Sequence, residues 1–126
     1  MGLIIKKLKV MGDRGEGMVN CLFDSGASWS FIRRDIVEKI ATPLKMSKPM
    51  RFRLGDGNGE IEAKEATHLS VEIEEGCEIF DDVVIVDKLA EDVIIGAKTL
   101  QAWRMRLDFE HDDIIIDKKA LELKLI

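Results

Sequence analysis

The sequence predicts an all-β domain with two short helices. Short runs rich in β-branched and apolar residues recur along the chain, and turns rich in Gly, Asp and Asn separate them. His68–Ile73 alternates polar and apolar residues, as a strand with one wet face does. Val83–Val86 is continuously apolar, which is typical of a strand buried on both faces. A length of 126 residues suits one domain, residues 1–126, and not two.

The N-terminal part of the chain predicts a hairpin followed by a helix. Leu3–Met11 and Met18–Phe23 flank a Gly-rich loop, so they form antiparallel strands. Ser30 is expected to cap a helix over Arg33–Ile40, because its hydroxyl can accept a hydrogen bond from a free N–H group of the first turn. Residues 43–49 begin and end with proline and predict an irregular connection.

The rest of the chain predicts further hairpins and the second helix. Arg51–Leu54 and Glu60–Ala63 flank the tip Gly55–Gly59, whose composition is typical of a tight turn. No internal repeat, low-complexity tract or linker follows. The later elements are strands at Val93–Ile95, Leu107–Phe109 and Ile114–Ile116, a helix over Ala97–Arg104, and a terminal strand over Leu121–Ile126.

The composition is that of a soluble globular protein. Hydrophobic residues make up 46% of the chain and charged residues 34%. The formal charge of −5 argues against nucleic acid as a partner, because phosphate binding requires a basic face. The apolar run within residues 1–7 is too short for a signal peptide or a membrane span. We therefore expect a cytoplasmic protein without a membrane partner.

The residues that most often bind metals are scattered. Cys21 and Cys77 stand far apart, so we expect reduced thiols, with a disulfide only if the fold brings them together. His68 and His111 are isolated and predict surface strand or turn positions. The tip at residues 55–59 lacks the Lys-Ser/Thr pair of a phosphate loop and the carboxylate series of an EF-hand. No metal and no cofactor are expected.

The clearest chemical signal is the tripeptide Asp24–Gly26. It places a carboxylate in a tight turn, where Gly26 lets a backbone N–H approach and donate to it. Two facing carboxylates that share a proton can act as base and acid and activate a water. The doublets at residues 81–82 and 112–113 do not form such a pair, because adjacent strand residues point to opposite faces. Asp-Ser-Gly is also common in ordinary turns, so the tripeptide alone leaves both interpretations open.

Two segments of the chain resemble one known family. Leu22–Ile32, with Asp-Ser-Gly-Ala at its centre, resembles the active-site signature of the retropepsin-like aspartic proteases. Val93–Leu100 resembles the apolar-apolar-Gly segment and short helix of the same family, and Arg106–Phe109 the strand after it. The resemblance spans residues 3–117. It implies the retropepsin-like acid protease β-barrel with two short helices, in its single-lobe form.

The same resemblance implies a role for each motif residue. Asp24 is the single catalytic carboxylate. The residues implied to support the active-site loop are Ser25, Gly26, Ala27, Ile94, Ile95 and Gly96. The residues implied to bind substrate are Ser28, Trp29, Leu54, Gly55, Gly57 and Gly59. For Trp29, core packing and a place in the cleft wall stay equally open.

A chain with one such motif implies a homodimer, in which two copies of Asp24 meet on a two-fold axis. The expected activity is aspartic endopeptidase hydrolysis of a peptide or protein substrate. Leu3–Ile5 and Leu121–Ile126 can interleave as dimer strands or form ordinary sheet edges. Residues 50–63 are expected to be the most mobile ordered segment, a flap whose Gly57 and Gly59 allow it to open.

Two alternatives to the enzyme stay open. A catalytically inactive protease-like module can keep the scaffold for dimerisation or peptide binding, and Ser25, where the family more usually has Thr, favours this reading. An unrelated small β-barrel can use Asp24 only to shape a turn.

Overall fold

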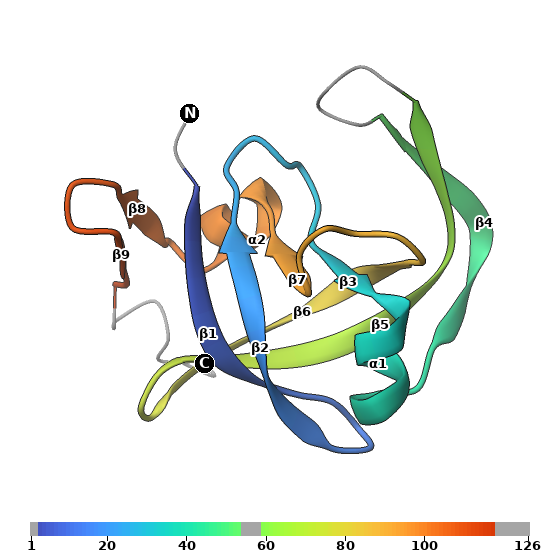
Figure 1. Cartoon of the computed structure of the whole chain (residues 1–126), viewed down its shortest axis with the longest axis horizontal. Coiled ribbons are helices and arrows are strands. Elements are labelled where there is room, and N and C mark those ends of the chain that lie inside the picture. The colour runs from blue at the N-terminus through green and yellow to red at the C-terminus, as the bar shows by residue number, and fades with distance from the viewer. Residues whose placement is uncertain (1–2, 54–58, 118–126) are drawn as a thin grey trace, which may run out of the picture.

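The computed structural model describes residues 3–53 and 59–117, and these form mainly strands (Figure 1). The predicted all-β class with two short helices is confirmed. The elements are β1 (Ile4–Met11), β2 (Glu16–Phe23), β3 (Phe31–Arg33), α1 (Arg34–Ile40), β4 (Leu44–Arg53), β5 (Glu60–Glu74), β6 (Cys77–Val86), β7 (Val93–Ile95), α2 (Ala97–Ala102), β8 (Arg106–Asp108) and β9 (Asp113–Ile115).

Six strands close into a barrel, and a seventh lies outside it. The strand order is β1-β2-β7-β3-β6-β5-β4, and an additional pairing of β1 with β5 closes the ring before β4 is reached. That closure joins Val10 to Val71, far apart in sequence. Strands β2 and β7 run parallel, as do β3 and β6. Strand β4 pairs only with β5 within the described residues and curves away from the barrel (Figure 1).

The barrel interior is the main hydrophobic core. Phe23, Ile32, Leu69 and Ile85 are almost completely buried there, each from a different strand. Because side chains alternate along a strand, every strand of the ring contributes inward residues to the same core. A second, smaller hydrophobic cluster lies between β4 and the barrel. Its partly buried residues, two of them aromatic, pack over three buried ones. The members of this second cluster are Ala63, Val84, Val86, Phe31, Met46, Phe52, Ile61 and Leu89.

Both cysteines are free, as expected of reduced thiols. Cys21 is fully buried in the core, and this burial raises the pKa of its thiol to about 12. Cys77 is half-buried at the start of β6. The Cys21 thiol is therefore almost entirely protonated at neutral pH and is a poor nucleophile.

The predicted cap of the first helix is wrong. The N-cap of α1 is Arg33, no side chain caps the helix, and Ser30 is buried three residues before Arg33. The reason is tertiary pairing: Phe31–Arg33 form β3 between β6 and β7, so the backbone stays extended until Arg34. The Arg33 guanidinium then bonds the Asp35 and Asp92 carboxylates, which fixes the strand-to-helix corner.

The irregular connection predicted for residues 43–49 is also wrong, because Leu44–Arg53 is one strand. Its pairing with β5 shifts register between Lys45 and Met50, so the intervening residues form an irregularity that accepts Pro49. Proline is compatible with an edge strand, where its missing N–H removes no necessary ladder bond. The predicted tip residues Leu54, Gly55 and Gly57 and the predicted terminal strand Leu121–Ile126 lie outside the described residues.

The second helix ends two residues earlier than expected. Helix α2 stops at Ala102, and Arg104 adopts a left-handed conformation with φ 53°. The N–H of Met105 donates to the carbonyl of Leu100 and that of Arg104 to Gln101, which is the bonding pattern of a Schellman C-cap. In the part of the chain that the structure describes, neither helix is long and apolar enough to cross a membrane.

Candidate active site

The loop after β2 holds Asp24 in a defined position. Asp24 is half-buried, and the N–H of Gly26 donates to its Oδ1 at 2.8 Å. The N–H of Asp24 donates to the carbonyl of Ile95 at 3.0 Å, and the N–H of Ala27 donates to the Asp24 carbonyl at 3.1 Å. An ordinary Asp turn would supply only the local bonds. The bond to Ile95 fastens this turn to a distant strand as well.

The turn between β7 and α2 packs directly under that loop. The N–H of Ala97 donates to the carbonyl of Ala27 at 2.6 Å, and the N–H of Lys98 donates to that of Ser28 at 3.1 Å. A Cβ atom at Gly96 would lie 2.2 Å from the carbonyl oxygen of Trp29, so only glycine permits this approach. The two segments predicted to meet, Asp24–Ala27 and Ile94–Gly96, are therefore brought together. Ile95 is buried beneath them and Ile94 is half-buried.

A buried hydroxyl network behind the loop was missed by sequence reasoning. Ser30 Oγ accepts the N–H of Gly96 at 3.0 Å and lies 2.6 Å from Thr99 Oγ1. Thr99 in turn hydrogen-bonds the Asp81 carboxylate from β6. The signal in the sequence was a single hydroxyl residue, Ser30, between the aromatic residues Trp29 and Phe31.

The structure describes some of the residues that are predicted to contact substrate. Ser25 and Ser28 are exposed on the loop, and Gly59 is exposed before β5 with φ 125°. Trp29 is half-buried and packs edge-on against Phe52 of β4, with ring centroids 6.3 Å apart. The Lys98 ammonium lies 4.0 Å from the centre of the Trp29 ring. Trp29 thus links the loop to the outer strand.

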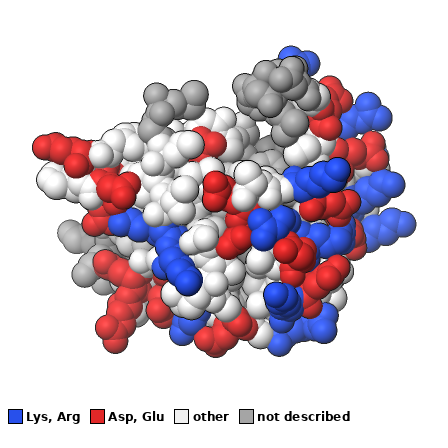
Figure 2. Space-filling model, viewed as in Figure 1, with Lys and Arg blue, Asp and Glu red and all other residues white. Residues whose placement is uncertain are grey.

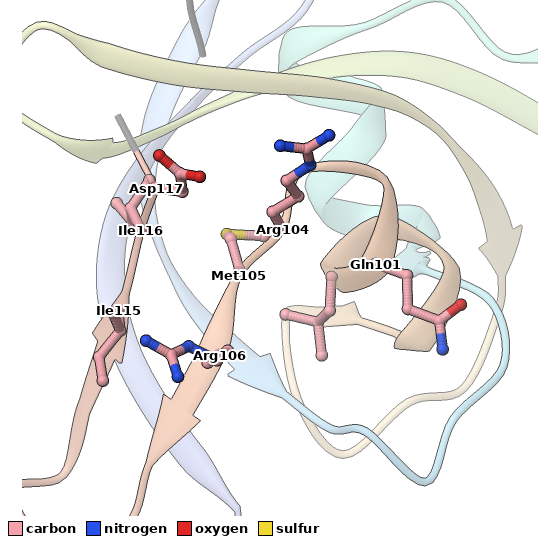
Figure 3. A pocket seen from close by; sticks show the side chains of 8 residues that line it. Gln101, Arg104, Met105, Arg106, Ile115, Ile116 and Asp117 are labelled. Atoms are coloured by element: carbon pink, nitrogen blue, oxygen red, sulfur yellow. The ribbon is translucent and has the colours of Figure 1, made fainter. Parts of the chain in front are cut away.

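Two hollows border α2, and Asp24 lines neither of them. One, of about 340 Å³, is lined in part by Ser25, Leu100 and Phe109. A larger one, of about 500 Å³, lies between α2 and the β8–β9 hairpin (Figure 3). Its lining residues are Leu100, Gln101, Arg104, Met105, Arg106, Ile115, Ile116 and Asp117.

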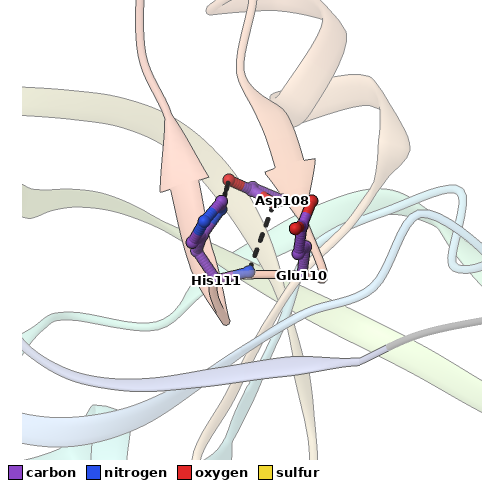
Figure 4. A group of neighbouring side chains, drawn as sticks. All are labelled: Asp108, Glu110 and His111. Carbon is purple, nitrogen blue, oxygen red and sulfur yellow. Dashed lines mark hydrogen bonds and ion pairs between the residues drawn. The ribbon is translucent and has the colours of Figure 1, made fainter.

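One group of side chains in the described ranges could supply metal ligands. Asp108, Glu110 and His111 place their ligand atoms within 4.8 Å of one another in the β8–β9 turn (Figure 4). The Asp108 carboxylate accepts hydrogen bonds from the ring and the backbone N–H of His111, at 2.8 and 3.3 Å, and the ring bond lowers the pKa of Asp108. These bonds cap the turn, which places His111 at a turn position as predicted.

The chain matches a peptidase family over most of its length. The family model of the Ty3 transposon peptidase matches residues 6–109, which contain both the Asp24 loop and the Gly96 turn. The chain belongs to this family of retropepsin-like peptidases. The predicted resemblance is thereby confirmed, and the alternative of an unrelated small β-barrel is excluded.

Two solved structures are similar to this chain, and one of them supports the fold. The retroviral protease-like domain of Ddi1 from Leishmania major is similar with a TM-score of 0.64 and 22% identity, over 93% of this chain and 90% of that one. A retropepsin-like aspartic protease from Rickettsia conorii matches with a TM-score of 0.48 and 19% identity, over 90% and 87% of the respective chains. The first of these likenesses confirms the retropepsin-like barrel.

Proposed function

We propose that this member of the peptidase family is an aspartic endopeptidase whose active site forms between two copies of the chain. The observation that carries the proposal is how the Asp24 side chain and backbone are held. The Gly26 N–H orients the carboxylate, the Asp24 backbone N–H is bonded to the Ile95 carbonyl, and the residue is only half-buried in the single chain. Asp-Ser-Gly occurs once in the sequence, so a second copy is the source of the second carboxylate.

Two such carboxylates have the chemistry that peptide hydrolysis needs. Two carboxyl groups at close range do not both ionise, because their negative charges would repel each other. The pair therefore holds one proton between them. The ionised carboxylate takes a proton from a water, whose oxygen then attacks the carbonyl carbon of the scissile amide. The protonated carboxylate gives its proton to the carbonyl oxygen. Breakdown of the tetrahedral adduct then transfers a proton to the leaving amide nitrogen and releases an acid and an amine.

The surface next to the Asp24 loop suits a symmetric dimer. Large hydrophobic side chains are exposed there, with Leu3 at 56%, Ile5 at 49% and Phe109 at 50%. Within the described ranges, the edge of β1 from Ile4 to Leu8 that faces away from β2 pairs with no other strand. Figure 2 shows uncharged side chains gathered over this part of the face, whereas charged ones gather over the β4–β5 side. An unpaired edge with an apolar rim favours pairing between identical chains.

The outer strand is the proposed cover of the substrate. Strand β4 and the beginning of β5 project from the barrel, and Phe52 leans from β4 onto Trp29 of the loop. An extended peptide could pair with this hairpin by backbone hydrogen bonds and place alternate side chains against the second cluster. The proposed substrate class is therefore an extended peptide segment with apolar residues around the cleavage point.

Cleavage of a diverse peptide library between acid and neutral pH tests the assignment. Asp24→Asn is expected to abolish cleavage while leaving the fold and the dimer intact, since Asn keeps the size and one acceptor oxygen. Asp82→Asn, a change of the same chemistry at an exposed strand position, is the matched control and is expected to cleave normally. Equal cleavage by wild type and Asp24→Asn would refute the role of Asp24. Peptide binding without cleavage by either protein would support the inactive module instead.

Subunit mixing tests whether two chains share the site. If subunits exchange freely, adding an equal amount of Asp24→Asn chains lowers the activity of a fixed amount of wild type to about half, because mixed dimers hold one carboxylate each. Asp82→Asn chains added in the same way are expected to leave the activity of the wild-type chains undiminished. A site contained in one chain would be insensitive to either addition. Sedimentation of each mixture gives the oligomeric state independently.

A further inference from the structure

We infer that Asp81, on β6, is a positioning residue that holds the Asp24 loop through Thr99 and Ser30. The inference rests on the proposed function, and it adds a residue to that site that lies outside the motif. The hydrogen bonds of Asp81 are to Thr99 and to the N–H of Asp82, not to Asp24. Its influence passes through two buried hydroxyls to the N–H of Gly96, the residue on which the loop rests.

The four groups form one continuous chain of hydrogen bonds. Gly96 N lies 3.0 Å from Ser30 Oγ, and Ser30 Oγ lies 2.6 Å from Thr99 Oγ1. Thr99 Oγ1 contacts Asp81 Oδ2, and the other carboxylate oxygen accepts the N–H of Asp82 at 2.8 Å. Ser30 is 3% exposed and Thr99 is 1% exposed, so water does not substitute for any inner bond.

The direction of every bond follows from its ends. A carboxylate only accepts, so the Thr99 hydroxyl donates to Asp81. The single proton of Thr99 is then used, and the Ser30 hydroxyl must donate to Thr99. The Gly96 N–H can only donate, and it donates to Ser30. Each hydroxyl therefore donates once and accepts once, and the carboxylate of Asp81 sets the orientation of both.

This chain of hydrogen bonds from Asp81 to Gly96, which we call the relay, ends next to the residues that bond the Asp24 loop. Gly96 is flanked by Ile95, whose carbonyl accepts the Asp24 N–H, and by Ala97, whose N–H donates to Ala27. A shift of Gly96 would move both bonds, because all three groups are on adjacent residues. Without an acceptor at position 81, the Thr99 hydroxyl turns to Ser30, and the Ser30 hydroxyl loses its own acceptor in a buried place. The relay then no longer fixes the turn.

Three variants separate the effect of the hydrogen bonds in the relay from the effect of side-chain packing. Thr99→Val keeps the shape of the side chain and removes the hydroxyl, whereas Thr99→Ser keeps the hydroxyl and restores the relay. Asp81→Asn retains an acceptor oxygen but can also donate, so it leaves the direction of the relay undetermined. Asp82→Asn, one residue further on the same strand and pointing toward His68, is the control.

The readouts are amide exchange at Gly96 and Gly26, and the division of cleavage kinetics between kcat and KM. In Thr99→Val we expect exchange at both amides about tenfold faster and kcat about tenfold lower, with KM within about twofold. Thr99→Ser should return both to near the wild-type values. Asp81→Asn should give smaller changes in the same direction, and it carries the test if Thr99→Val fails to fold.

Unchanged exchange at Gly96 and Gly26 in Thr99→Val and Asp81→Asn would overturn the inference. So would a Thr99→Ser variant as impaired as Thr99→Val, since that result would assign the effect to the lost methyl group. The exchange measurement needs no substrate. Wild-type protein that cleaves no peptide would refute the proposed function, while faster exchange in the two variants would still establish that Asp81 and Thr99 hold the loop.

Discussion

The Asp24 loop and the β4–β5 arm, which comprises residues 44–53 and 59–64, are held to the barrel in opposite ways. The loop donates a hydrogen bond to Ile95 and accepts hydrogen bonds from Ala97 and Lys98, and its neighbour Ser30 accepts one from Gly96. The arm lies outside the closed ring, and β4 pairs only with β5 among the described residues. Its apolar contacts belong to the small second cluster, in which Phe52 is only half-buried.

The proposed function requires separate mechanical roles of the two regions. A catalytic carboxylate must be held within a fraction of an ångström of its working position, which many bonds to a buried core provide. A cover for an extended substrate must open and close, and regions with few buried apolar contacts open at the lowest free energy. The tightly bonded loop and the loosely held arm match these two requirements of the proposed function, so changes in the two regions should have unequal effects.

The largest effect is expected from Gly96→Ala. The added Cβ would lie 2.2 Å from the Trp29 carbonyl oxygen and 2.7 Å from that of Ala27, and both are backbone atoms that cannot move aside. We expect the free energy of unfolding to fall by more than about 3 kcal/mol, measured by denaturant titration. Gly17→Ala is the matched control, because a Cβ at Gly17 meets nothing within 4 Å. Similar stability of the two variants would contradict the rigid packing of the loop.

A smaller effect is expected from Phe52→Ala in the arm. Phe52 packs against Phe31, with ring centroids 5.0 Å apart, and against Trp29. Because the ring is only half-buried, its loss should lower the free energy of unfolding by about 2 kcal/mol rather than the larger value of a full core position. Leu44→Ala, on the same strand but 60% exposed, should change it by less than about 0.5 kcal/mol. An equal cost for both would show that the second cluster contributes no specific packing.

Much of the fold could be predicted because local patterns and tertiary pairing agree. The alternation in His68–Ile73 and the apolar run Val83–Val86 both lie in strands at the expected places. The errors arose where pairing overrides a local signal. Ser30 has the chemistry of a helix cap, yet the β3 pairing keeps the chain extended. Pro49 is a strand breaker, yet an edge strand with a register shift accepts it. Barrel closure between β1 and β5 leaves no local signal.

The candidate site divides in the same way. Asp24, Gly26 and Gly96 could be found because their residue types are themselves informative. Asp24 and Gly26 form a turn that holds a carboxylate, and Gly96 stands where no Cβ fits. The relay of Ser30, Thr99 and Asp81 could not be found, since its members come from three separate segments and each is an ordinary polar residue by itself. Only the barrel brings them together.

Amide exchange can sharpen the comparison within one experiment. Ile61 and Ala63, which pair with Phe52 and Met50 in the arm, should exchange at least about tenfold faster than Cys21 and Ile95 in the barrel. That ratio corresponds to an opening free energy lower by about 1.4 kcal/mol. Strong protection throughout the arm of the free protein would contradict its proposed role as a movable flap. A saturating peptide ligand should slow exchange in the arm more than in the barrel.

The smallest effect concerns the segment just before β4 and the dependence of protein stability on pH. The Asp13 carboxylate accepts hydrogen bonds from the hydroxyl and the N–H of Thr42, at 2.6 and 2.7 Å, and Thr42 lies two residues before β4 begins. The side-chain bond from Thr42 is the main cause that lowers the pKa of Asp13 below its ordinary value of 3.8.

A lowered pKa in the folded state means that the unfolded chain binds the proton more readily. The stabilisation by Asp13 is therefore present above pH 3.8 and is lost as the pH falls through the lower value of the folded protein. Asp13→Asn keeps an acceptor for Thr42 but cannot titrate, so its melting temperature should fall slightly less steeply with acid than that of the wild type. Melting curves between pH 2 and 7 measure this slope. Because Asp13 is exposed, solvent screens the interaction, and a large change of slope would mean that Asp13 fixes far more of the arm than its two bonds to Thr42 imply.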